Sequence, residues 1–396
     1  MTRRLMDALC NEGADARMLV IDKGSDSLRI AEVASNWKAR FTFLAEHADI
    51  LTRNGFKRDT LFKISTAQFG LPLLSHPWVV EADAIILNWV NQGMASLREI
   101  KRIADLKPVI WTMHDQWNMT GVCHYTDGCE NRFTDRCRNC PLLPKGSKLA
   151  NKVFNAKERL YRSTNIRFVA VSNRLAEMCS QSPLMSDAKI SVIPNAFPTD
   201  KFGITPAMSR QQLRLPEERR LIVMGAARLD NPVKNLPLAI DSLNIIADSH
   251  SSENLFAVFF GQIRNPKILA RLKMPHASLG PITNHQQLQS LLAHSAVVMS
   301  TSLWETLPGT IVEGISCGAA AVATSNGGQT DIITPDLGYI APHNEPRQIA
   351  QAISSALTLP DDIATRQYRH RAMTERFGAP AVARAYLRLI RSALKL

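Results

Sequence analysis

The chain has 396 residues, 45% of them hydrophobic, so it is long enough for two or three domains with real cores. No window approaches 18 consecutive apolar residues, which argues against a transmembrane helix. The N-terminus has basic residues, but Asp7 breaks its apolar run, which argues against a signal peptide. We therefore expect a cytoplasmic protein, and a net charge of +12 predicts attraction to nucleic acid, an anionic membrane surface or phosphorylated substrates.

The first half of the chain reads as an α/β series that begins with a helix. Apolar residues at helical spacing predict this helix over residues 1–14, and a strand is expected at 16–22. Residues 26–75 are mixed and poorly periodic, so no element is assigned there. Further strands are expected at 82–90, 108–113, 166–171 and 190–193, with a helix at 96–104 and Ser172 as the cap of another.

A hinge between two domains is expected where two prolines fall within five residues, at 194–198. A second α/β series follows it. Its expected strands lie at 221–225, 255–260, 296–300 and 320–324, and its expected helices at 235–248, 286–293, 346–358, 361–376 and 379–396.

The strongest single signal is the segment between Ser302 and Gly328, which carries Glu305 and Glu313 eight positions apart. Pro308 suits the first turn of a short helix, and Gly318 suits its C-terminal cap. Glu305 is then expected in the loop before the helix and Glu313 on the helix. Because a helix N-terminus attracts anions, this arrangement predicts a site for an anion flanked by hydroxyl groups, such as a nucleotide diphosphate sugar.

Two cations lie six residues apart at the end of the first strand of the second series, in the segment AARLDNPVKNL. Arg228 follows the strand and Lys234 is expected at the start of the next helix. Two positive charges at the end of a strand can stabilise a departing diphosphate. Alone, this pattern is also that of ordinary surface charges.

His114 and Asp115 stand just past the carboxyl end of the strand expected at 108–113. Ligands of open α/β sheets bind at that end of the strands, which makes the pair a candidate part of a site. A histidine and an aspartate that cap or support the core would give the same pattern.

Four cysteines follow within 18 residues, and the last two have the spacing of half a zinc site. A structural zinc on Cys123, Cys129, Cys137 and Cys140 is one interpretation, with His124 as a candidate replacement ligand. Disulfides and free thiols are the others, although a cytosolic protein favours metal over disulfides. A zinc-bearing nucleic-acid or scaffold protein would also fit the charge, but the cluster lacks the interleaved basic and aromatic residues of a nucleic-acid surface.

These segments together resemble the family 4 glycosyltransferases, which are retaining enzymes of the GT-B fold. The likeness runs from the first helix to the C-terminus and rests on the Glu305 to Glu313 spacing, on Arg228 and Lys234, and on His114. The pattern HDQWNMTGVC, followed by CRNCP, resembles a subgroup that builds bacterial surface polysaccharides, colanic acid transferases among them. The chain departs from the family at Asn235 and Ala196, where glycine is usual, and at Thr301-Ser302, where Pro-Ser is usual.

The resemblance implies an α/β chain of GT-B architecture, with two Rossmann-like domains facing across a cleft. The expected domains are an acceptor-side domain at 1–194 with a cysteine-rich insertion at 123–141, a nucleotide-sugar domain at 199–376, and a C-terminal helix at 377–396 that crosses back. Such folds usually begin with a strand and a Gly-rich loop, and neither precedes the first helix here. An impaired transferase, or a nucleotide-sugar epimerase on the same fold, is therefore kept as an alternative.

The resemblance also implies the role of each site residue in a hexosyltransferase. Glu313 is expected to bind the ribose of a UDP- or GDP-sugar, Glu305 and His114 to contact the donor sugar with support from Asp115, and Arg228 with Lys234 to neutralise the diphosphate. The segment at the helix start, Leu307, Pro308, Gly309 and Thr310, is expected to bind the donor, with the backbone N–H groups of its non-proline residues assisting. No cofactor is then required for catalysis. The expected acceptor is a glycan or a lipid-linked oligosaccharide, with peripheral association at the inner face of the cytoplasmic membrane.

Overall fold

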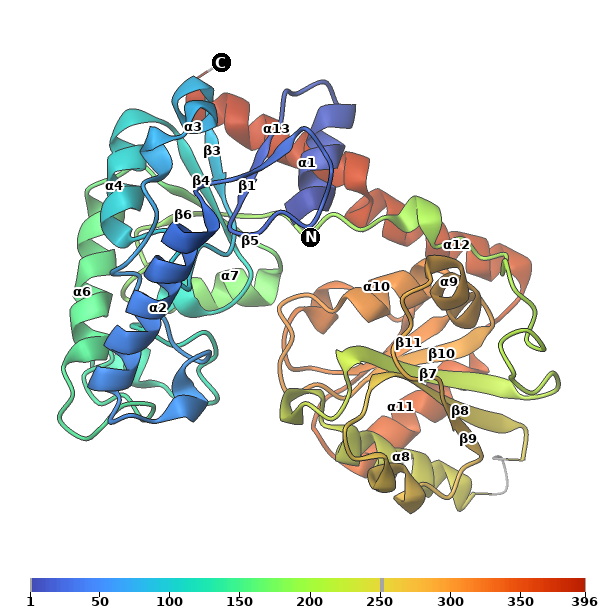
Figure 1. Cartoon of the computed structure of the whole chain (residues 1–396). Coiled ribbons are helices and arrows are strands. Elements are labelled where there is room, and N and C mark those ends of the chain that lie inside the picture. The colour runs from blue at the N-terminus through green and yellow to red at the C-terminus, as the bar shows by residue number, and fades with distance from the viewer. Residues whose placement is uncertain (1, 250–252, 396) are drawn as a thin grey trace. The chain divides into compact units, whose positions relative to one another are not determined.

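The computed structural model describes residues 2–249 and 253–395, and they divide into two compact units. The N-terminal unit consists of Thr2–Pro194 together with Ala383–Leu396, and the C-terminal unit of Asn195–Val382. Each unit is built on a parallel sheet covered by helices (Figure 1).

A four-stranded parallel sheet forms the centre of the described N-terminal unit, in the order β3-β4-β5-β6. Every residue of β4 is buried, as expected of a central parallel strand covered on both faces. The sheet and the helices connected with it are β3 (Ile85–Leu87), β4 (Val109–Met113), β5 (Arg167–Ala170), β6 (Lys189–Val192), α3 (Pro77–Glu81), α4 (Leu97–Leu106), α6 (Leu149–Arg162) and α7 (Asn173–Ser180). Ser96 and Ser172 accept hydrogen bonds from Glu99 N and Leu175 N, which confirms Ser172 as a helix cap.

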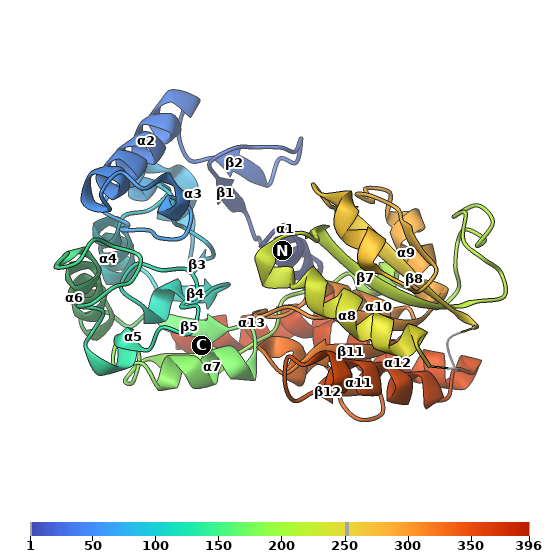
Figure 2. The ribbon, with the colours of Figure 1, turned by 90° about the horizontal axis from the view of Figure 1, so that it is seen from below.

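The first strand of the chain pairs outside this sheet. β1 (Met18–Val20) confirms the strand expected at 16–22, but it forms a small parallel sheet of its own with β2 (Ile30–Glu32). It follows α1 (Thr2–Asn11), the helix predicted at the start of the chain. Residues 26–75, which had no assignment, contain an 18-residue helix, α2 (Asn36–Arg53), drawn at the edge of the N-terminal unit in Figure 2. A four-residue helix, α5 (Asn131–Thr134), lies within the cysteine-rich segment.

The described C-terminal unit contains a six-stranded parallel sheet in the order β12-β11-β10-β7-β8-β9. Its strands are β7 (Arg220–Arg228), β8 (Leu255–Gln262), β9 (His276–Ser278), β10 (Ser295–Ser300), β11 (Ala320–Thr324) and β12 (Gly338–Ala341). The helices are α8 (Leu236–Ala247), α9 (His285–Ala293), α10 (Gly309–Ser316), α11 (Pro346–Thr358) and α12 (Ile363–Phe377). In Figure 1, α8 and α11 cover one face of the sheet, and α9, α10 and α12 cover the other.

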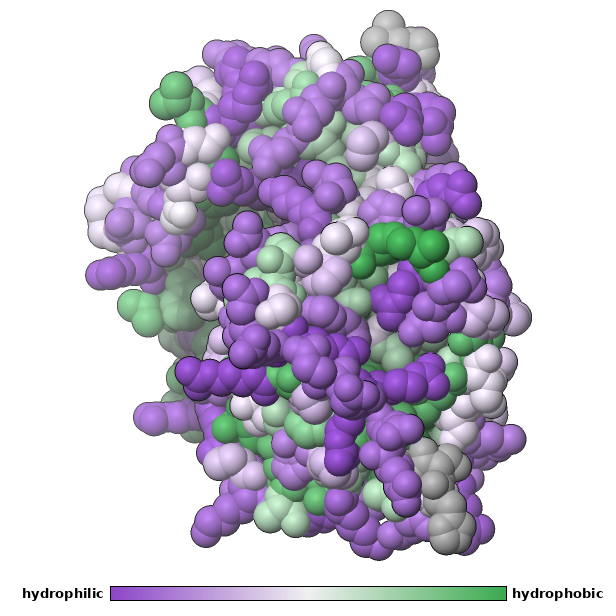
Figure 3. Space-filling model, turned by 90° about the vertical axis from the view of Figure 1, so that its right-hand side faces the viewer, coloured by the Kyte–Doolittle hydropathy of each residue, from purple (hydrophilic) through white to green (hydrophobic). Residues whose placement is uncertain are grey.

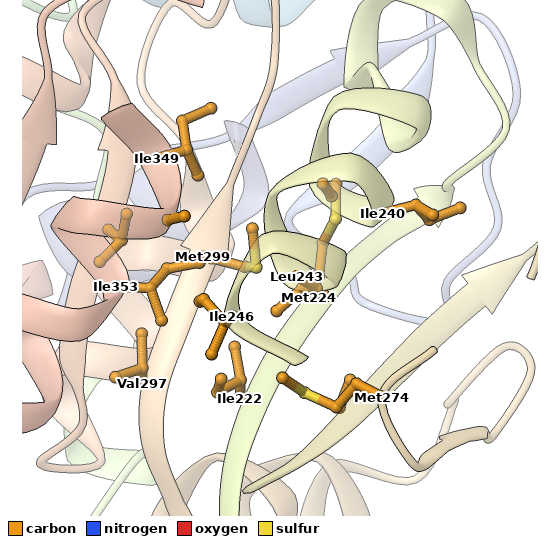
Figure 4. Close-up of a cluster of buried hydrophobic side chains, with 14 of the residues drawn as sticks. Ile222, Met224, Ile240, Leu243, Ile246, Met274, Val297, Met299, Ile349 and Ile353 are labelled. Carbon is orange, nitrogen blue, oxygen red and sulfur yellow. The ribbon is translucent and has the colours of Figure 1, made fainter. Parts of the chain in front are cut away.

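A cluster of buried aliphatic side chains lies between the sheet and the pair α8 and α11 (Figure 4). Ile222 and Val297 from neighbouring strands point into it, and Leu243 and Ile353 reach it from the two helices. β7 and β10 occupy the middle of the sheet; β10 is buried up to its last residue, and β7 is buried from Leu221 to Met224. This packing fixes the strand ends that carry the candidate site.

The last helix, α13 (Ala379–Leu394), is shared between the units. Up to Val382 it belongs to the C-terminal unit, and from Ala383 it packs in the N-terminal unit. There the Tyr386 hydroxyl lies 2.8 Å from Thr112 Oγ1, and Arg384 forms a 3.0 Å ion pair with Glu12. No helix of the described chain is both long and apolar enough to cross a bilayer.

Candidate active site

Three of the predicted site residues follow two neighbouring strands at the middle of the C-terminal sheet. Arg228 is the last residue of β7, and Lys234 ends a short 3-10 turn, η5 (Pro232–Lys234), before α8. Glu305 lies in the loop between β10 and α10. Because β7 and β10 pair in parallel, their carboxyl ends meet at one edge of the sheet.

The structure brings Lys234 and Glu305 into direct contact. The Lys234 ammonium donates to Glu305 Oε1, and Ser302 Oγ donates to the same oxygen at 2.8 Å. Both side chains keep a minority of their surface exposed. The contact is therefore a partly shielded ion pair at the edge of the sheet, where a ligand can still reach it.

Arg228 is oriented by an aspartate two residues further on. Its Nε donates to Asp230 Oδ1 at 2.9 Å, and Asp230 Oδ2 accepts from Arg264 N at 2.8 Å. The hydrogen bond from Arg228 holds the pKa of the Asp230 carboxyl below its usual range. Asp230 thereby fixes the Nε edge of the guanidinium.

The backbone of Glu305 is held by the loop after β11. Glu305 N donates to Asn326 O at 3.2 Å, and Gly328 N donates to Glu305 O at 2.9 Å. Gly327 has a φ of 131°, and a Cβ there would lie 2.0 Å from Glu305 O. Only glycine fits so close a backbone approach.

Glu313 lies on α10, whose N-terminus follows the Glu305 loop. Pro308 is the N-cap of this helix, Gly309 is its first residue, and the preceding Leu307 is buried. Thr310 Oγ1 donates to Gly225 O of β7 at 3.3 Å, which ties the first turn of α10 to the sheet. N–H groups of a first helical turn have no partner within the helix, so this end of α10 can receive an anion.

Asn235, where the resembling family has glycine, has a left-handed backbone with a φ of 51°. Asparagine tolerates that conformation better than most residues, which explains why the substitution is compatible with the turn. Thr301 Oγ1 donates to the carbonyls of Lys234 and Asn235, both at 3.0 Å. The turn that carries Lys234 is thus attached to the end of β10.

His114 and Asp115 belong to the other unit, where they follow β4. His114 Nε2 donates to Asn88 Oδ1 at 2.9 Å, and burial lowers the pKa of His114 from 6.5 to about 4. His114 is therefore a neutral side chain at physiological pH.

Asp115 is buried in a hydrogen-bonded network of the N-terminal unit. One carboxylate oxygen accepts from Trp117 N at 2.8 Å, and the other accepts from Trp89 Nε1 at 3.0 Å and His124 Nδ1 at 2.7 Å. His124 Nε2 in turn lies 3.2 Å from Ser65 Oγ. These contacts make Asp115 a support of the loop that follows His114.

The cysteine-rich segment is packed over a buried lysine. Lys157 Nζ donates to Trp117 O at 2.6 Å and Thr120 O at 3.1 Å, and burial lowers its pKa. It also lies 3.3 Å from the centre of the Trp117 ring. The loop between Asp115 and the cysteines is therefore held by α6, the helix that carries Lys157.

All seven cysteines are free thiols, so the disulfide alternative was wrong. Within residues 2–249 and 253–395, no three His, Cys, Asp or Glu side chains are arranged to hold a metal ion. Burial raises the pKa of Cys137 to about 12 and of Cys140 to about 11, so both thiols are protonated at neutral pH in the metal-free chain. Both ring nitrogens of His124 are engaged, so it does not fit as a replacement ligand. Zinc on Cys123, Cys129, Cys137 and Cys140 stays a prediction from their spacing.

Four polar residues of these sites were not predicted: Asp230, Ser302, Thr301 and Asn88. Each lies within a few residues of the carboxyl end of a parallel strand. That position is the signal that could have identified them, since polar residues there face the ligand edge of an α/β sheet.

Comparison with known proteins agrees with this geometry. Residues 207–374 match the family model "Glycosyl transferases group 1". The chain is 22% identical over 312 residues to WcaC of Escherichia coli (strain K12), named as a colanic acid biosynthesis glycosyl transferase, covering 75% of this chain and 72% of that protein. It is 27% identical over 166 residues, 42% of each chain, to a GDP-mannose-dependent phosphatidylinositol dimannoside mannosyltransferase of Mycobacterium tuberculosis (strain ATCC 25177 / H37Ra).

Solved structures share the fold. A glycosyltransferase from Rickettsia africae ESF-5 superposes with a TM-score of 0.66 at 15% identity, covering 100% of this chain and 94% of that one. Anabaena Alr3699/HepE, solved in complex with UDP-glucose, gives 0.54 at 17% identity, covering 81% of this chain and 82% of that one. The resemblance to glycosyltransferases is thereby confirmed: residues 207–374 match the group 1 glycosyl transferase family model, and the chain has the GT-B fold.

Proposed function

We propose that this glycosyltransferase is a retaining hexosyltransferase of family 4 that uses a UDP- or GDP-sugar donor. The observation that carries the proposal is the cluster at the ends of β7 and β10, where Lys234, Glu305 and Ser302 meet in front of the N-terminus of α10. A nucleotide sugar offers matching groups, namely a diphosphate for cations and hydroxyls for a carboxylate.

The donor diphosphate is assigned to Arg228, Lys234 and the first turn of α10, with N–H groups of the 307–310 segment. Charge grows on the diphosphate as the bond to the sugar breaks, and fixed cations with a helix N-terminus stabilise that charge. Because these groups supply the positive charge, the reaction requires no metal ion. A chelator in the assay is expected to leave the rate unchanged.

Glu313 is assigned to the ribose hydroxyls and Glu305 to the donor sugar. A carboxylate accepts hydrogen bonds from two vicinal hydroxyls, and such charge-assisted bonds are stronger than neutral ones. His114 is assigned to the donor sugar by the family resemblance, and its low pKa suits a neutral hydrogen-bonding group. We attribute retention of the anomeric configuration to attack by the acceptor hydroxyl on the face of the sugar that the diphosphate leaves. An oxygen of the departing diphosphate acts as the base that takes the hydroxyl proton.

The proposed acceptor is a growing bacterial surface glycan on a lipid carrier. Support comes from WcaC, named for colanic acid biosynthesis, and from the solved structure of WaaG, a glycosyltransferase involved in lipopolysaccharide biosynthesis, whose TM-score is 0.60. The chain covers 42% of its mannosyltransferase relative, so that protein's donor and acceptor remain proposals here.

The first test is a thermal-shift screen of the whole chain against UDP, GDP, ADP and CMP and their sugars. Stabilisation by one nucleotide that is absent in Glu313→Ala would support the donor site, because a ligand of the folded state raises Tm. Glu345→Ala, an exposed glutamate at the start of α11, is the matched control. No shift with any nucleotide would contradict the proposal. A changed sugar released without an acceptor would indicate an epimerase instead.

A further inference from the structure

Two parallel strands of the N-terminal unit each have one side without a partner strand. Among the strands that the structure describes, β1 pairs with β2 alone and β3 pairs with β4 alone. The backbone N–H and C=O groups on the other side of each strand therefore belong to no ladder. We refer to these two sides as the open edges of β1 and β3.

Both strands have the composition of strands from the middle of a sheet. β1 reads MLV and β3 reads IIL, without a charged residue or a proline. Continuous apolar runs are typical of parallel strands covered on both faces, whereas exposed edge strands usually carry lysine, proline or a bulge. Yet Met18, Leu19, Val20, Ile85 and Ile86 are all partly exposed. These two strands thus combine an interior composition with the exposure of an edge.

The partly exposed apolar residues are contiguous along each strand. On the face drawn in Figure 3, by contrast, hydrophobic side chains are interspersed among hydrophilic ones. Contiguous apolar residues beside unpaired backbone groups are the features to which an additional β-strand binds, since its backbone completes the ladder and its side chains cover the apolar surface.

The two open edges begin close to each other. Arg17, directly before β1, forms a 3.2 Å ion pair with Glu81, the last residue of α3, and α3 leads into β3. The Arg17 guanidinium also lies 5.5 Å from the centre of the Trp78 ring on α3. One additional strand, at the usual spacing of about 4.8 Å from each neighbour, would therefore join the two sheets into one.

The strand order indicates which strand this is. Placed between the open edges, it gives the order β2-β1-added strand-β3-β4-β5-β6. The added strand then has the position of the first strand in a doubly wound sheet, with the second strand on one side and the fourth on the other.

α1 has the place of the helix that follows such a first strand. Leu5, Met6 and Leu9 are buried, so the helix is packed in the N-terminal unit, and it leads directly into β1. In parallel sheets a helix of this kind connects two strands of the same sheet by a right-handed return. The strand from which α1 returns would be the neighbour of β1 on its open edge.

We propose that the open edges of β1 and β3 bind one extended apolar strand, which runs parallel to both and leads into α1. A strand joined to the amino end of α1 is the occupant that the topology favours, because the helix then makes the usual right-handed return to β1. Since parallel strands share their carboxyl edge, the added strand would end at the edge where His114 follows β4. This inference concerns the N-terminal sheet and does not depend on the sugar-transfer proposal.

Hydrogen exchange of the full chain, with and without a strand fused ahead of residue 1, tests the proposal. The fused strand consists of valine and isoleucine and is followed by a short linker of glycine and serine. We expect it to slow amide exchange in β1 and β3 by about tenfold or more, because it closes both open edges. Exchange in β6, at the far edge of the same sheet, should stay unchanged. The matched control is the same fusion with proline at alternate positions, which cannot donate to a ladder and should protect neither strand.

Two pairs of variants show whether the fused strand lies between the open edges. Leu19→Lys with Ile86→Lys should remove most of the protection, because both lysines would be enclosed by the completed sheet. Leu28→Lys with Leu106→Lys adds the same charge at two exposed positions of the same unit and should leave the protection as it is. Circular dichroism of each variant separates loss of binding from loss of fold.

Three outcomes would overturn the proposal. The first is unchanged exchange in β1 and β3 on fusion of the strand, or protection of β6 instead. The second is equal protection by the same strand added as a free peptide at equimolar concentration, because a strand joined to α1 gains from its high effective concentration. The third is a dimer of the unextended chain that already protects both edges, which sedimentation of the same samples measures.

Discussion

Lys234 and Glu305 lie 71 residues apart in the chain, yet their charged groups are in contact at the carboxyl ends of two paired strands. Glu305 Oε1 accepts from both Lys234 and Ser302. The ammonium is thus held at the edge of the sheet before any ligand arrives. Groups fixed in advance cost no reorganisation when charge develops on a leaving group.

Removal of either partner of this pair is expected to abolish most of the transfer activity. Lys234→Ala should lower kcat by about 10²- to 10³-fold, the usual effect of removing one stabilising donor from a site of developing charge. Glu305→Ala should have an effect of similar size. Because the two groups act as one unit, the double variant should lose little more than either single variant. Steady-state release of the nucleotide diphosphate measures all three.

The matched control for the pair is Lys273→Ala, which removes an exposed lysine that pairs with Asp248 elsewhere in the same unit. It should keep wild-type kinetics, since exposed ion pairs contribute little. Additive losses in the Lys234 and Glu305 variants would contradict their joint role, and wild-type rates in both would overturn the site.

Loss of Asp230 should impair the reaction through Arg228. Asp230→Asn keeps the shape of the side chain but removes the charge that holds Arg228 Nε. We expect kcat/KM to fall about tenfold, mainly through kcat, if the guanidinium stabilises the transition state. Asp230→Glu should recover part of the loss. If Arg228→Ala and Asp230→Asn proved additive in a double-mutant cycle, Asp230 would not act by positioning Arg228.

Most of the regular elements were predictable because their signals are local. Buried runs of β-branched and small residues identified β10 and β11, and a serine cap identified the start of α7. The helix that carries Glu313 was also predicted, with Gly318 just past its C-cap in a left-handed conformation at a φ of 92°. Strand ends then located the candidate site, since ligand edges follow from parallel topology.

The missed elements depend on contacts that one segment cannot reveal. α2 was not recognised because its exposed face is apolar, which blurs the helical period that a surface helix usually shows. β1 was predicted as a strand, but only the fold shows that it pairs with β2 outside the main sheet. Lys157, fully buried beneath the cysteine-rich segment, looks in the sequence like an ordinary helical lysine.

Acid is expected to weaken the N-terminal unit through His114. Burial lowers the pKa of His114 from 6.5 to about 4, so the folded state prefers the neutral ring. Below pH 6.5 the His114 side chain is protonated in the unfolded chain but stays neutral in the folded chain. Its contribution to the free energy of unfolding is therefore fully present above pH 6.5 and is lost as the pH falls to about 4. Between pH 7 and pH 5 the loss should be on the order of 1–2 kcal/mol.

Urea unfolding at pH 7 and pH 5 measures this effect when wild type is compared with His114→Asn. The variant has no group that titrates at this position, so its stability should fall less between the two pH values. His343→Asn, an exposed histidine of the other unit, is the control and should follow wild type. Equal slopes in wild type and His114→Asn would show that His114 does not retain a low pKa.

The end of α10 opposite the candidate site is held by α12, which leads to a prediction about stability. The fully buried Arg369 donates to Gly318 O at 3.0 Å and Pro360 O at 3.1 Å, and His370 Nδ1 donates to Ser316 O at 2.8 Å. The bonds to Gly318 O and Ser316 O satisfy carbonyls at the C-terminal end of α10 that the helix itself leaves unpaired, and the bond to Pro360 O holds the segment before α12. Arg369→Met fills a similar volume but leaves the buried Gly318 carbonyl and the part-buried Pro360 carbonyl without this donor, which should cost about 2–4 kcal/mol.

Thermal unfolding of the whole chain should show the loss of stability in Arg369→Met as a fall in the Tm of the C-terminal unit on the order of 5–10 °C. Arg371→Met, an exposed arginine two residues further along the same helix, should change Tm by little. Arg369→Met should lower nucleotide affinity only to the extent that it destabilises α10, because Arg369 contacts the end of this helix that is remote from the candidate site. A large loss of affinity at unchanged Tm would instead mean that α12 acts on the site directly.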